Sequence, residues 1–350
     1  MRIVISTDAW MPQINGVVRT LTNLITALRN SGHEVHVIEP QQFNTVPMPG
    51  YSEIRLAVLP DLKVRRLLWE TDPDAIHIVT EGPIGAATRC YCKMRRLHFT
   101  TSFHTRFPEY IKARVPVLPL WPGYAMMNFF HGAAERTMVS TPQLREELSM
   151  RGMRNLVIWP RGVDTEMFQP MGKDFLEDGR PIFMYVGRVS VEKNVEDFLL
   201  SRLPGTKYVV GDGPARTDLE RKYPDVRFVG TQVGEDLVRY ISAADCLVFP
   251  SRTDSLGLVV MEALACGVPV AAYPVLGPSS ILRNGVSGYL DEDLSRAALK
   301  AVELDPQVCR QAAMQFSLQN SAEIFLEHLV PTRHKINISI LDELMETKRG

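Results

Sequence analysis

Short apolar runs alternate with longer amphipathic stretches along the first half of the chain. Residues 2–6 and 34–38 have the length and apolar content of buried strands. Between them, residues 17–29 place their apolar side chains on one helical face, and Gly32 follows where such a helix would end. Strand, helix and strand form a βαβ unit, whose repetition predicts a parallel sheet. Further strands are predicted at residues 54–58, 75–79, 98–102, 137–140 and 156–159.

The same alternation begins again in the second half, after a segment that lacks it. Residues 164–180 contain several Pro and Gly and no sustained periodicity, as expected of a linker. We predict an α/β protein of two doubly wound, Rossmann-like domains, residues 1–168 and 169–331, facing each other across a cleft at the carboxyl ends of their sheets. Residues 332–350 are predicted to be a tail or a crossing helix, with residues 341–345 as its helical part. Strands of the second domain are predicted at residues 182–186, 207–210, 226–229, 245–249, 268–272 and 288–290.

Composition and charge are those of a globular cytoplasmic protein. Of 350 residues, 45% are hydrophobic and 23% charged, which suffices for two cores of average size. The first apolar run is too short for a signal peptide, and the longest one, residues 256–276, is interrupted by Glu262, so we expect no transmembrane helix. Five cysteines without zinc-site spacing favour reduced thiols. The formal charge of -1 divides into +4 over residues 1–168 and -5 over the remainder, which predicts different partners for the two halves.

A diphosphate clamp is predicted where the first strand of the second domain ends. Arg188 and Lys193 stand five residues apart in the segment after residues 182–186. Two cations at a strand end, beside a helix N-terminus, can hold a diphosphate and stabilise the negative charge that develops on it as it leaves. From the spacing alone, the alternative that both are solvated residues of a surface loop is equally open.

A second candidate site follows the predicted strand at residues 245–249. If a helix begins near Gly257, the backbone amides of Gly257 and Leu258 favour a phosphate in the cleft. Asp254 would then lie beside the transferred sugar, and Glu262, one turn into the helix, would bind ribose hydroxyls. The alternative is that Asp254 caps the helix and Glu262 is a solvated helix residue.

Two candidates belong to the first domain. Gly16, between the first strand and the first helix, would let backbone amides approach a phosphate or a sugar closely, although a turn alone also explains it. His104 falls just past the strand predicted at residues 98–102, on the cleft side. A single histidine is more often structural than catalytic.

Neither a metal site nor a dinucleotide fingerprint is predicted. Asp291 and Asp293 have the Asp-x-Asp spacing of metal-dependent sugar transferases, but they precede a predicted helix, and acids at a helix start explain them better. Gly211 and Gly213 lack the third glycine of the dinucleotide fingerprint, and no Walker-type loop occurs. We therefore expect no metal cofactor, and neither a dehydrogenase nor a P-loop enzyme.

In combination, these motifs resemble glycosyltransferase family 4. The resemblance extends over about residues 1–330 and implies the GT-B fold, a retaining reaction and no divalent metal. Motifs of the first half are similar to a bacterial branch that contains α-mannosyltransferases and glycosyl-diacylglycerol or sulfolipid-type synthases. The motifs are Asn15-Gly16-Val17-Val18-Arg19, Ser102-Phe-His-Thr-Arg-Phe-Pro-Glu109, Arg161-Gly-Val-Asp164, Gly187-Arg188-x4-Lys193, Gly211-Asp-Gly213 and Asp254-x7-Glu262.

The resemblance also implies roles for single residues. It assigns the diphosphate to Arg188 and Lys193, the ribose to Glu262, hydroxyls of the donor sugar to Asp254, its C6 side to His104 and the phosphates to Gly16. Of these, His104, Asp254, Arg188 and Lys193 are the expected catalytic residues. Asp254 stands where the family usually has Glu, and Leu256 where Phe is commoner. The implied reaction is same-face attack, in which the departing phosphate oxygen takes the proton of the acceptor.

The acceptor is predicted from basic and aromatic residues of the first half. Residues 89–114 contain seven Lys or Arg and one acid, interleaved with aromatic residues, and residues 115–134 contain no Asp, Glu, Lys or Arg. Basic and aromatic residues together suit an anionic membrane surface. The absence of any nucleic-acid motif argues against nucleic acid as a partner. The alternative is a helix pair packed in the core with a solvated basic face. The expected contact residues are Lys93, Arg95, Arg96, Lys112 and Trp121.

We therefore predict a retaining glycosyltransferase that moves a hexose-type sugar from a UDP- or GDP-sugar to a membrane lipid acceptor such as diacylglycerol. It would be peripherally associated with the inner face of the cell membrane. The alternative is a GDP-mannose-dependent α-mannosyltransferase that acts on a glycan or another acceptor. A phosphorylase or epimerase on the same fold, and a catalytically silent module that senses a nucleotide sugar, stay open as rivals, because fold alone does not determine function.

Overall fold

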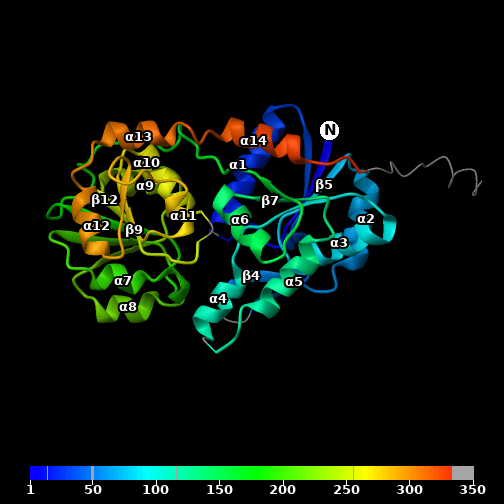
Figure 1. Cartoon of the computed structure of the whole chain (residues 1–350), viewed down its shortest axis with the longest axis horizontal. Coiled ribbons are helices and arrows are strands. Elements are labelled where there is room, and N and C mark those ends of the chain that lie inside the picture. The colour runs from blue at the N-terminus through cyan, green and yellow to red at the C-terminus, as the bar shows by residue number, and fades with distance from the viewer. Residues whose placement is uncertain (14, 49–50, 116, 255, 333–350) are drawn as a thin grey trace, which may run out of the picture.

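The computed structural model describes residues 1–13, 15–48, 51–115, 117–254 and 256–332. In this part of the chain, two six-stranded parallel sheets lie side by side, each covered by helices on both faces (Figure 1). The first sheet has the strand order β2-β1-β5-β6-β7-β8, and the second has the order β11-β10-β9-β12-β13-β14. This is the predicted pair of doubly wound α/β units.

The first sheet and its helices occupy the amino half of the chain. The strands of this sheet are β1 (Arg2–Ser6), β2 (Glu34–Ile38), β5 (Ala75–Ile78), β6 (Thr100–Ser102), β7 (Arg136–Val139) and β8 (Leu156–Ile158). The helices are α1 (Gly16–Asn30), the 3-10 turn η1 (Pro40–Gln42), α2 (Asp61–Thr71), α3 (Pro83–Arg95), α4 (Phe107–Arg114), α5 (Trp121–His131) and α6 (Pro142–Met150).

The second sheet begins after a segment, residues 159–181, that adds no strand to either sheet. Its strands are β9 (Ile182–Val186), β10 (Thr206–Val210), β11 (Arg227–Gly230), β12 (Cys246–Phe249), β13 (Val270–Ala272) and β14 (Gly288–Leu290). The helices are η2 (Val191–Lys193), α7 (Val195–Leu200), α8 (Arg216–Lys222), α9 (Gly234–Ala243), α10 (Leu258–Ala265), α11 (Leu276–Ser279), α12 (Leu294–Ala301) and α13 (Pro306–Ala313). The last described helix, α14 (Leu318–His328), follows them in the chain.

The central strands read as continuous apolar runs because both of their faces are buried. In β1, Ile3 and Ile5 pack into the core under α1, whereas Val4 between them packs into the core on the opposite face of the sheet. In β9, Met184 faces one core and Phe183 the other. Successive side chains of a strand point to opposite faces, so a parallel sheet covered on both sides needs apolar residues at every position.

The strand predicted at residues 54–58 belongs to neither parallel sheet, so its place in the predicted βα repeat is wrong. It is part of β4 (Tyr51–Ala57), which pairs antiparallel with β3 (Thr45–Met48) in a separate two-stranded sheet. The physical reason is local: β3 and β4 are close in sequence, and a short connection permits only antiparallel pairing, because a parallel pair requires a long crossover.

The chain returns to the first domain at its described end. Helix α14 packs against α1, and Ala322 and Phe325 join the core that contains Ile3 and Ile5 (Figure 1). This crossing element lies within the predicted range 169–331, and the helix predicted at residues 341–345 lies outside the described residues. Among the described helices, none is long and apolar enough to cross a membrane.

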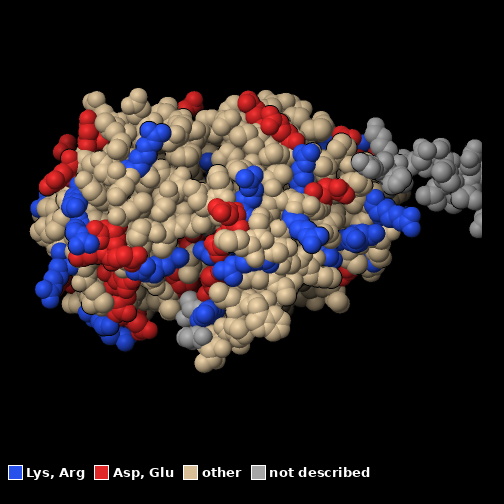
Figure 2. Space-filling view, in the orientation of Figure 1, with Lys and Arg blue, Asp and Glu red and all other residues tan. Residues whose placement is uncertain are grey.

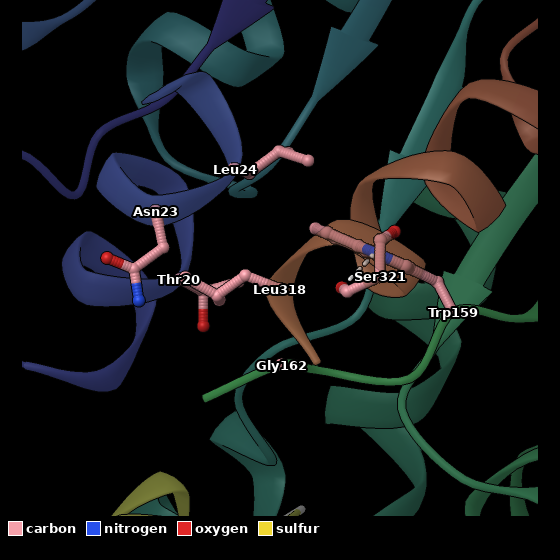
Figure 3. Close-up of a pocket in the computed structure, with 7 residues that line it drawn as sticks. All are labelled: Thr20, Asn23, Leu24, Trp159, Gly162, Leu318 and Ser321. Atoms are coloured by element: carbon pink, nitrogen blue, oxygen red, sulfur yellow. Dashed lines mark hydrogen bonds between the residues drawn. The ribbon is translucent and has the colours of Figure 1, made fainter. Parts of the chain in front are cut away.

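The chain passes between the two domains twice, and the two segments lie side by side where Val163 meets Ser317, at the start of α14. Val163 forms a parallel bridge with Ser317, and a Cβ at Gly162 would lie 2.7 Å from the Ser317 carbonyl oxygen. The indole Nε1 of Trp159 donates to the carbonyl oxygen and Oγ of Ser321, at 3.0 and 3.1 Å. Figure 3 shows the small cavity at this junction, with side chains of α1 on one side and Trp159 and Ser321 on the other.

Candidate active site

Three of the predicted cleft residues, Gly16, Arg188 and Lys193, follow the strands at which the order of each sheet reverses. In the first sheet β1 lies between β2 and β5, and in the second β9 lies between β10 and β12. The loops that leave such neighbouring strands run to opposite faces and open a crevice at the carboxyl ends. Gly16 follows β1, whereas Arg188 and Lys193 follow β9, so residues predicted separately lie at these two switch points.

The two domains approach each other closely at Gly16 and Leu258. Gly16 begins α1, and the Oδ1 of Asn15 caps this helix by accepting from the amides of Val17 and Val18, both at 3.0 Å. Leu258 begins α10, and a Cβ at Gly16 would lie 3.5 Å from its Cδ1. The N-termini of two helices from different domains therefore lie close together, and helix N-termini favour anions.

Lys193 and Asp254 form an ion pair across the second switch point. Lys193 ends η2, Asp254 lies in the loop after β12, and the Nζ of Lys193 donates to the Oδ1 of Asp254. Tyr110 of α4 joins them from the first domain, with its hydroxyl 3.3 Å from Lys193 Nζ and 3.3 Å from Asp254 Oδ1. The sequence argument missed Tyr110, although it directly follows the family-like run at residues 102–109.

Burial and charge act in opposite directions on Lys193. Burial disfavours its ammonium, but the Asp254 carboxylate and the nearby hydroxyls of Tyr110 and Tyr185 outweigh burial and raise the pKa of Lys193. Burial raises the pKa of Tyr110 to about 12, with Lys193 acting in the opposite direction. At neutral pH, Lys193 therefore keeps a fixed positive charge and Tyr110 keeps its proton.

Arg188 is half-buried in the loop between β9 and η2. The hydroxyl of Tyr185 donates to the Arg188 carbonyl oxygen at 2.6 Å and so holds the backbone of this loop. Between them, Gly187 has a φ of +151°, and a Cβ there would lie 2.9 Å from the Tyr185 hydroxyl oxygen. A glycine is required before the cation because a side chain would displace the tyrosine that orients the loop.

Helix α10 begins after Gly257, as predicted. Gly257 has a φ of +92°, and a Cβ there would lie 2.9 Å from Cζ of Phe249, so the backbone and the available space both require glycine. Gly257 is the N-cap, and because it has no side chain it accepts no bond from the first amides of α10. Asp254 therefore does not cap this helix, which removes one of the two alternatives for that residue.

Glu262 is buried, with 2% of its surface exposed, so it is not a solvated helix residue. Its Oε1 accepts from Nη1 of Arg19, which lies on α1 in the other domain. Its Oε2 is buried and has no hydrogen-bond partner. Sequence reasoning missed Arg19, although it closes the family-like run at residues 15–19. A buried carboxylate oxygen without a donor is suited to a ligand hydroxyl.

His104 lies past β6 among buried polar side chains of the first domain. Its Nε2 is 2.7 Å from Oγ of Ser102, and its ring stands edge-on to Trp159 with 6.1 Å between the centroids. Burial, and then the positive charge of Arg161, hold the pKa of His104 well below its usual range. The imidazole is therefore neutral at physiological pH and suited to hydrogen bonding with a hydroxyl.

The predicted basic contact residues lie on the outside of the first domain. Lys93, Arg95 and Arg96 are exposed at the end of α3, and Lys112 is exposed on α4. Figure 2 shows basic side chains toward the part of the first domain that carries α2 and α3, and a largely uncharged surface over α4 and α5.

Helix α5 has one buried face and one exposed aromatic face. Tyr124 and Met127 are buried, whereas Trp121 is 72% and Phe129 is 73% exposed. The guanidinium of Arg89 on α3 stacks on Phe129, 4.4 Å from the ring centroid. The alternative interpretation of this segment was a helix pair packed in the core. It describes the side of α5 that carries Tyr124 and Met127, but not the side that carries Trp121 and Phe129.

The Asp-x-Asp motif serves a helix start, as predicted. Oδ1 of Asp293 accepts from the amides of Ser295 and Arg296, at 2.9 and 3.2 Å, and Asp291 forms an ion pair with Arg296. Within the described residues, no three His, Cys, Asp or Glu side chains are grouped so that they could hold a metal ion.

Comparison with known proteins identifies the family. A family model described as Glycosyltransferase Family 4 matches residues 14–167, and one described as Glycosyl transferases group 1 matches residues 180–304. The chain belongs to glycosyltransferase family 4. Between them, the two models cover both halves of the cleft, on each side of the segment that joins β8 to β9.

Relatives of this family 4 member differ in what their names say they act on. The sulfoquinovosyl transferase SQD2 of Arabidopsis thaliana is 29% identical over 79% of this chain, and the aligned part is 61% of the plant protein. A GDP-mannose-dependent alpha-mannosyltransferase of Mycobacterium tuberculosis is 26% identical over 83% of each chain. An alpha-monoglucosyldiacylglycerol synthase of Streptococcus pneumoniae is 23% identical over 93% of this chain and 83% of its own.

Solved structures confirm the GT-B fold. Sucrose-phosphate synthase from Thermosynechococcus elongatus superposes with a TM-score of 0.72 at 20% identity, covering 93% of this chain and 97% of that one. Anabaena HepE in complex with UDP and glucose gives a TM-score of 0.68 at 17% identity, covering 93% and 98%. At these identities the likeness shows the architecture, two doubly wound domains around a cleft, and not the substrate.

Proposed function

We propose that this family 4 member is a retaining glycosyltransferase that moves a hexose-type sugar from a UDP- or GDP-sugar to a membrane lipid acceptor such as diacylglycerol, without a metal. The observation that carries the proposal is helix α4, which joins the cleft to an exposed surface. Tyr110 contacts Lys193 and Asp254, while the next two residues, Ile111 and Lys112, are exposed. Only helix α4 would separate an acceptor bound at this surface from the donor sugar.

The donor is assigned to the second switch point. Arg188, Lys193 and the amides at the start of α10 would bind the diphosphate, because cations and helix N-termini both favour negative charge. The orphaned Oε2 of Glu262 would accept from a ribose hydroxyl. When the diphosphate takes Lys193 as its partner, Asp254 is released from its ion pair and becomes available to the hydroxyls of the sugar.

The chemistry follows from these positions. The acceptor hydroxyl attacks the anomeric carbon on the face from which the diphosphate leaves, and the departing phosphate oxygen takes the hydroxyl proton. Arg188 and Lys193 hold the negative charge that grows on the diphosphate, and the neutral imidazole of His104 bonds to the C6 side of the sugar. Catalysis is then mostly positioning and fixed electrostatics, with no covalent intermediate on the protein.

The lipid acceptor is supported by the surface around α4 and α5. Exposed apolar side chains on and between α4 and α5, together with exposed basic ones, suit a peripheral contact with an anionic bilayer, at the inner face of the cell membrane. Two of the relatives, the alpha-monoglucosyldiacylglycerol synthases of Streptococcus pneumoniae and Acholeplasma laidlawii, favour a glycolipid product by their names. The exposed apolar residues are Ile111, Val115, Val117, Leu118, Trp121, Met126 and Phe129.

The second candidate is a GDP-mannose-dependent α-mannosyltransferase with a glycan or another non-diacylglycerol acceptor. Its support is the set of mycobacterial and corynebacterial relatives with that name, which align over 83% to 86% of this chain. Release of UDP or GDP from a panel of nucleotide hexoses, each with diacylglycerol or with a mannoside, distinguishes the two candidates. Turnover of GDP-mannose with the mannoside alone would favour the second.

The membrane contact is tested by flotation with anionic liposomes. We expect the wild-type protein to float at low ionic strength and to be partly released by salt, because each basic residue near such a surface contributes about 1 kcal/mol. Changing Lys93, Arg95, Arg96 and Lys112 to Glu should abolish flotation. The matched control changes four exposed basic residues of the second domain to Glu, namely Arg202, Arg221, Arg239 and Lys300, and should leave flotation intact.

The aromatic part of the contact is tested separately. Trp121→Ser with Phe129→Ser should remove the fraction that high salt does not release, and both side chains are exposed enough for the fold to tolerate the change. Equal flotation of the wild-type protein and the Glu variant, or no flotation of either, would exclude this surface as the membrane contact and favour the glycan acceptor.

A further inference from the structure

A buried arginine of the first domain has no part in the donor site described above. Arg161 follows Trp159 and Pro160 after β8, and only 5% of its surface is exposed. Its Nη1 donates to the carbonyl oxygen of Trp159 at a long 3.3 Å, and its Nη2 is buried without any hydrogen-bond partner. A buried donor on a charged group is costly to leave unpaired, so this guanidinium calls for an acceptor.

The groups around Arg161 include no carboxylate that compensates it. Burial lowers the pKa of Arg161 to about 9, and no nearby acid offsets that effect. Burial first, and the charge of Arg161 second, lower the pKa of the neighbouring His77 and His104, whose imidazoles are therefore neutral. Another acid of this domain, Glu81, is bonded to a histidine, with its Oε1 2.9 Å from Nε2 of His131. Among the described residues, the guanidinium is thus a buried cation with no ion-pair partner.

The position of the guanidinium is held firmly by its neighbours. It stacks on the indole of Trp159, with Cζ 3.6 Å from the ring centroid, and His104 stands edge-on to the same indole. The indole is itself held by its hydrogen bonds to Ser321 of α14 (Figure 3). A donor that is fixed before the ligand arrives loses little freedom on binding, which favours recognition.

We propose that Arg161 forms an oxyanion-binding subsite, and that the transferred sugar or the acceptor carries a carboxylate, sulfonate or phosphate that its guanidinium binds. The proposal rests on the proposed function, which brings both substrates to the carboxyl ends of the first sheet. Arg161 follows β8 and His104 follows β6 at that edge, so the oxyanion would lie beside the neutral imidazole. Guanidinium is the side chain best suited to planar or tetrahedral oxyanions.

The diphosphate of the donor is a less suitable occupant of this subsite. Its expected partners, Arg188, Lys193 and the start of α10, all belong to the second domain, whereas Arg161 is fixed in the first. The sugar and the acceptor head group are the parts of the reaction that contact the first domain. The two sources share one chemistry, and separate probes distinguish them.

The test measures the melting temperature of the whole protein with matched charged and neutral probes at constant ionic strength. D-glucuronate against D-glucose represents the sugar, and glycerol 3-phosphate against glycerol represents the acceptor. At ten times its Kd, the charged member of the correct pair should raise Tm by roughly 3–6 °C more than the neutral one. UDP is measured separately, since its effect reports on the donor site alone.

Arg161→Met should abolish the preference for the charged probe and leave the UDP shift unchanged. The ligand-free variant should melt at the wild-type temperature or above, because it replaces an uncompensated buried cation by an apolar side chain. The matched control is Arg154→Met, which removes an exposed arginine of the same domain and should leave all the Tm shifts at their wild-type values. Arg161→Lys keeps the charge without the planar fork and should retain a reduced shift, which covers the case in which Arg161→Met fails to fold.

Three results would overturn the subsite. One is a wild-type protein that responds equally to the charged and neutral member of both pairs. Another is an Arg161→Met variant that keeps the wild-type preference. The third is loss of the UDP shift in that variant, which would assign Arg161 to the diphosphate. A wild-type protein that prefers the charged probe but binds neither UDP nor GDP would support the subsite and refute the donor assignment.

Discussion

Replacing Arg19 by Met tests whether the ion pair with Glu262 joins the two domains and prepares the ribose site. Arg19 lies on α1 and Glu262 on α10, and only 3% of the Glu262 side chain is exposed. With Oε2 already unpartnered, loss of Arg19 would leave both carboxylate oxygens without a side-chain donor in the described part of the chain. The variant should therefore destabilise the protein mainly through a stranded buried charge.

The size of the effect follows from burial. Removing one partner of a buried ion pair costs about 3–5 kcal/mol. Because 30% of the Arg19 side chain is exposed, water can reach the vacated position, and we expect the lower end of that range, about 3 kcal/mol. A loss of this size would lower Tm by roughly 6–12 °C for a cooperative unit of 150–250 residues.

The assay is a double-mutant cycle read by thermal and urea unfolding. Arg19→Met, Glu262→Gln and the double variant are compared with the wild-type protein. In the Glu262→Gln background no charge remains to be stranded, so Arg19→Met should then cost only a few tenths of a kcal/mol. UDP should stabilise Arg19→Met more than the wild-type protein, because ribose hydroxyls would supply the missing donors.

A coupling free energy near zero would refute this reasoning. It would mean that Arg19→Met costs the same with Glu as with Gln at position 262, and that the pair contributes nothing specific to the contact between α1 and α10. An equal UDP shift in the wild-type protein and in Arg19→Met would separately remove Glu262 from the ribose site.

Three further predictions concern the clamp, metals and pH. Lys193→Ala and Arg188→Ala should each lower kcat by the equivalent of about 2.7–4 kcal/mol in the barrier, and Lys193→Ala should also lower Tm because it removes the ion-pair partner of Asp254. Near-normal turnover of both variants would remove the clamp. Excess chelator should leave activity intact, whereas recovery of lost activity with manganese would point to a metal site. The pKa of His77 is lowered to about 3 by burial, Arg161 and His131. Below pH 6.5 the His77 imidazole therefore binds a proton in the unfolded chain but stays neutral in the folded protein. The free energy of unfolding should fall by up to about 1.4 kcal/mol per pH unit as the pH drops from 6.5 toward 3. In urea titrations His77→Gln should flatten that slope, and an unchanged slope would contradict the assignment.

Most of the fold is encoded locally and could be predicted. The bounds of β1, β2, β9 and β14 match the predicted strands residue for residue, because each is a short run rich in apolar residues that is bounded by polar residues, Gly or Pro. The apolar face of α1 was equally visible, since five buried side chains recur at helical spacing. The strand at residues 54–58 was assigned to the wrong sheet because an apolar run does not specify its partner strand.

The site was predictable only in part. Arg188, Lys193, Gly257 and Glu262 could be placed because they follow strand ends or begin a helix, and such positions are visible in sequence. The motifs also contained Arg19, but nothing in its spacing indicated a partner on α10. Its contact depends on how one domain lies against the other.

The tertiary structure alone decided which side chains share the cleft. Tyr110 reaches Lys193 and Asp254 across 83 and 144 residues of sequence, and Arg19 reaches Glu262 across 243. Local periodicity reports whether a residue is helical or buried, whereas these contacts depend on the relative position of two separately folded sheets. The same holds for Arg161, whose lack of a counter-charge is a property of everything packed around it. The sequence determined the two sheets and their loops, and the packing of one domain on the other determined the chemistry between them.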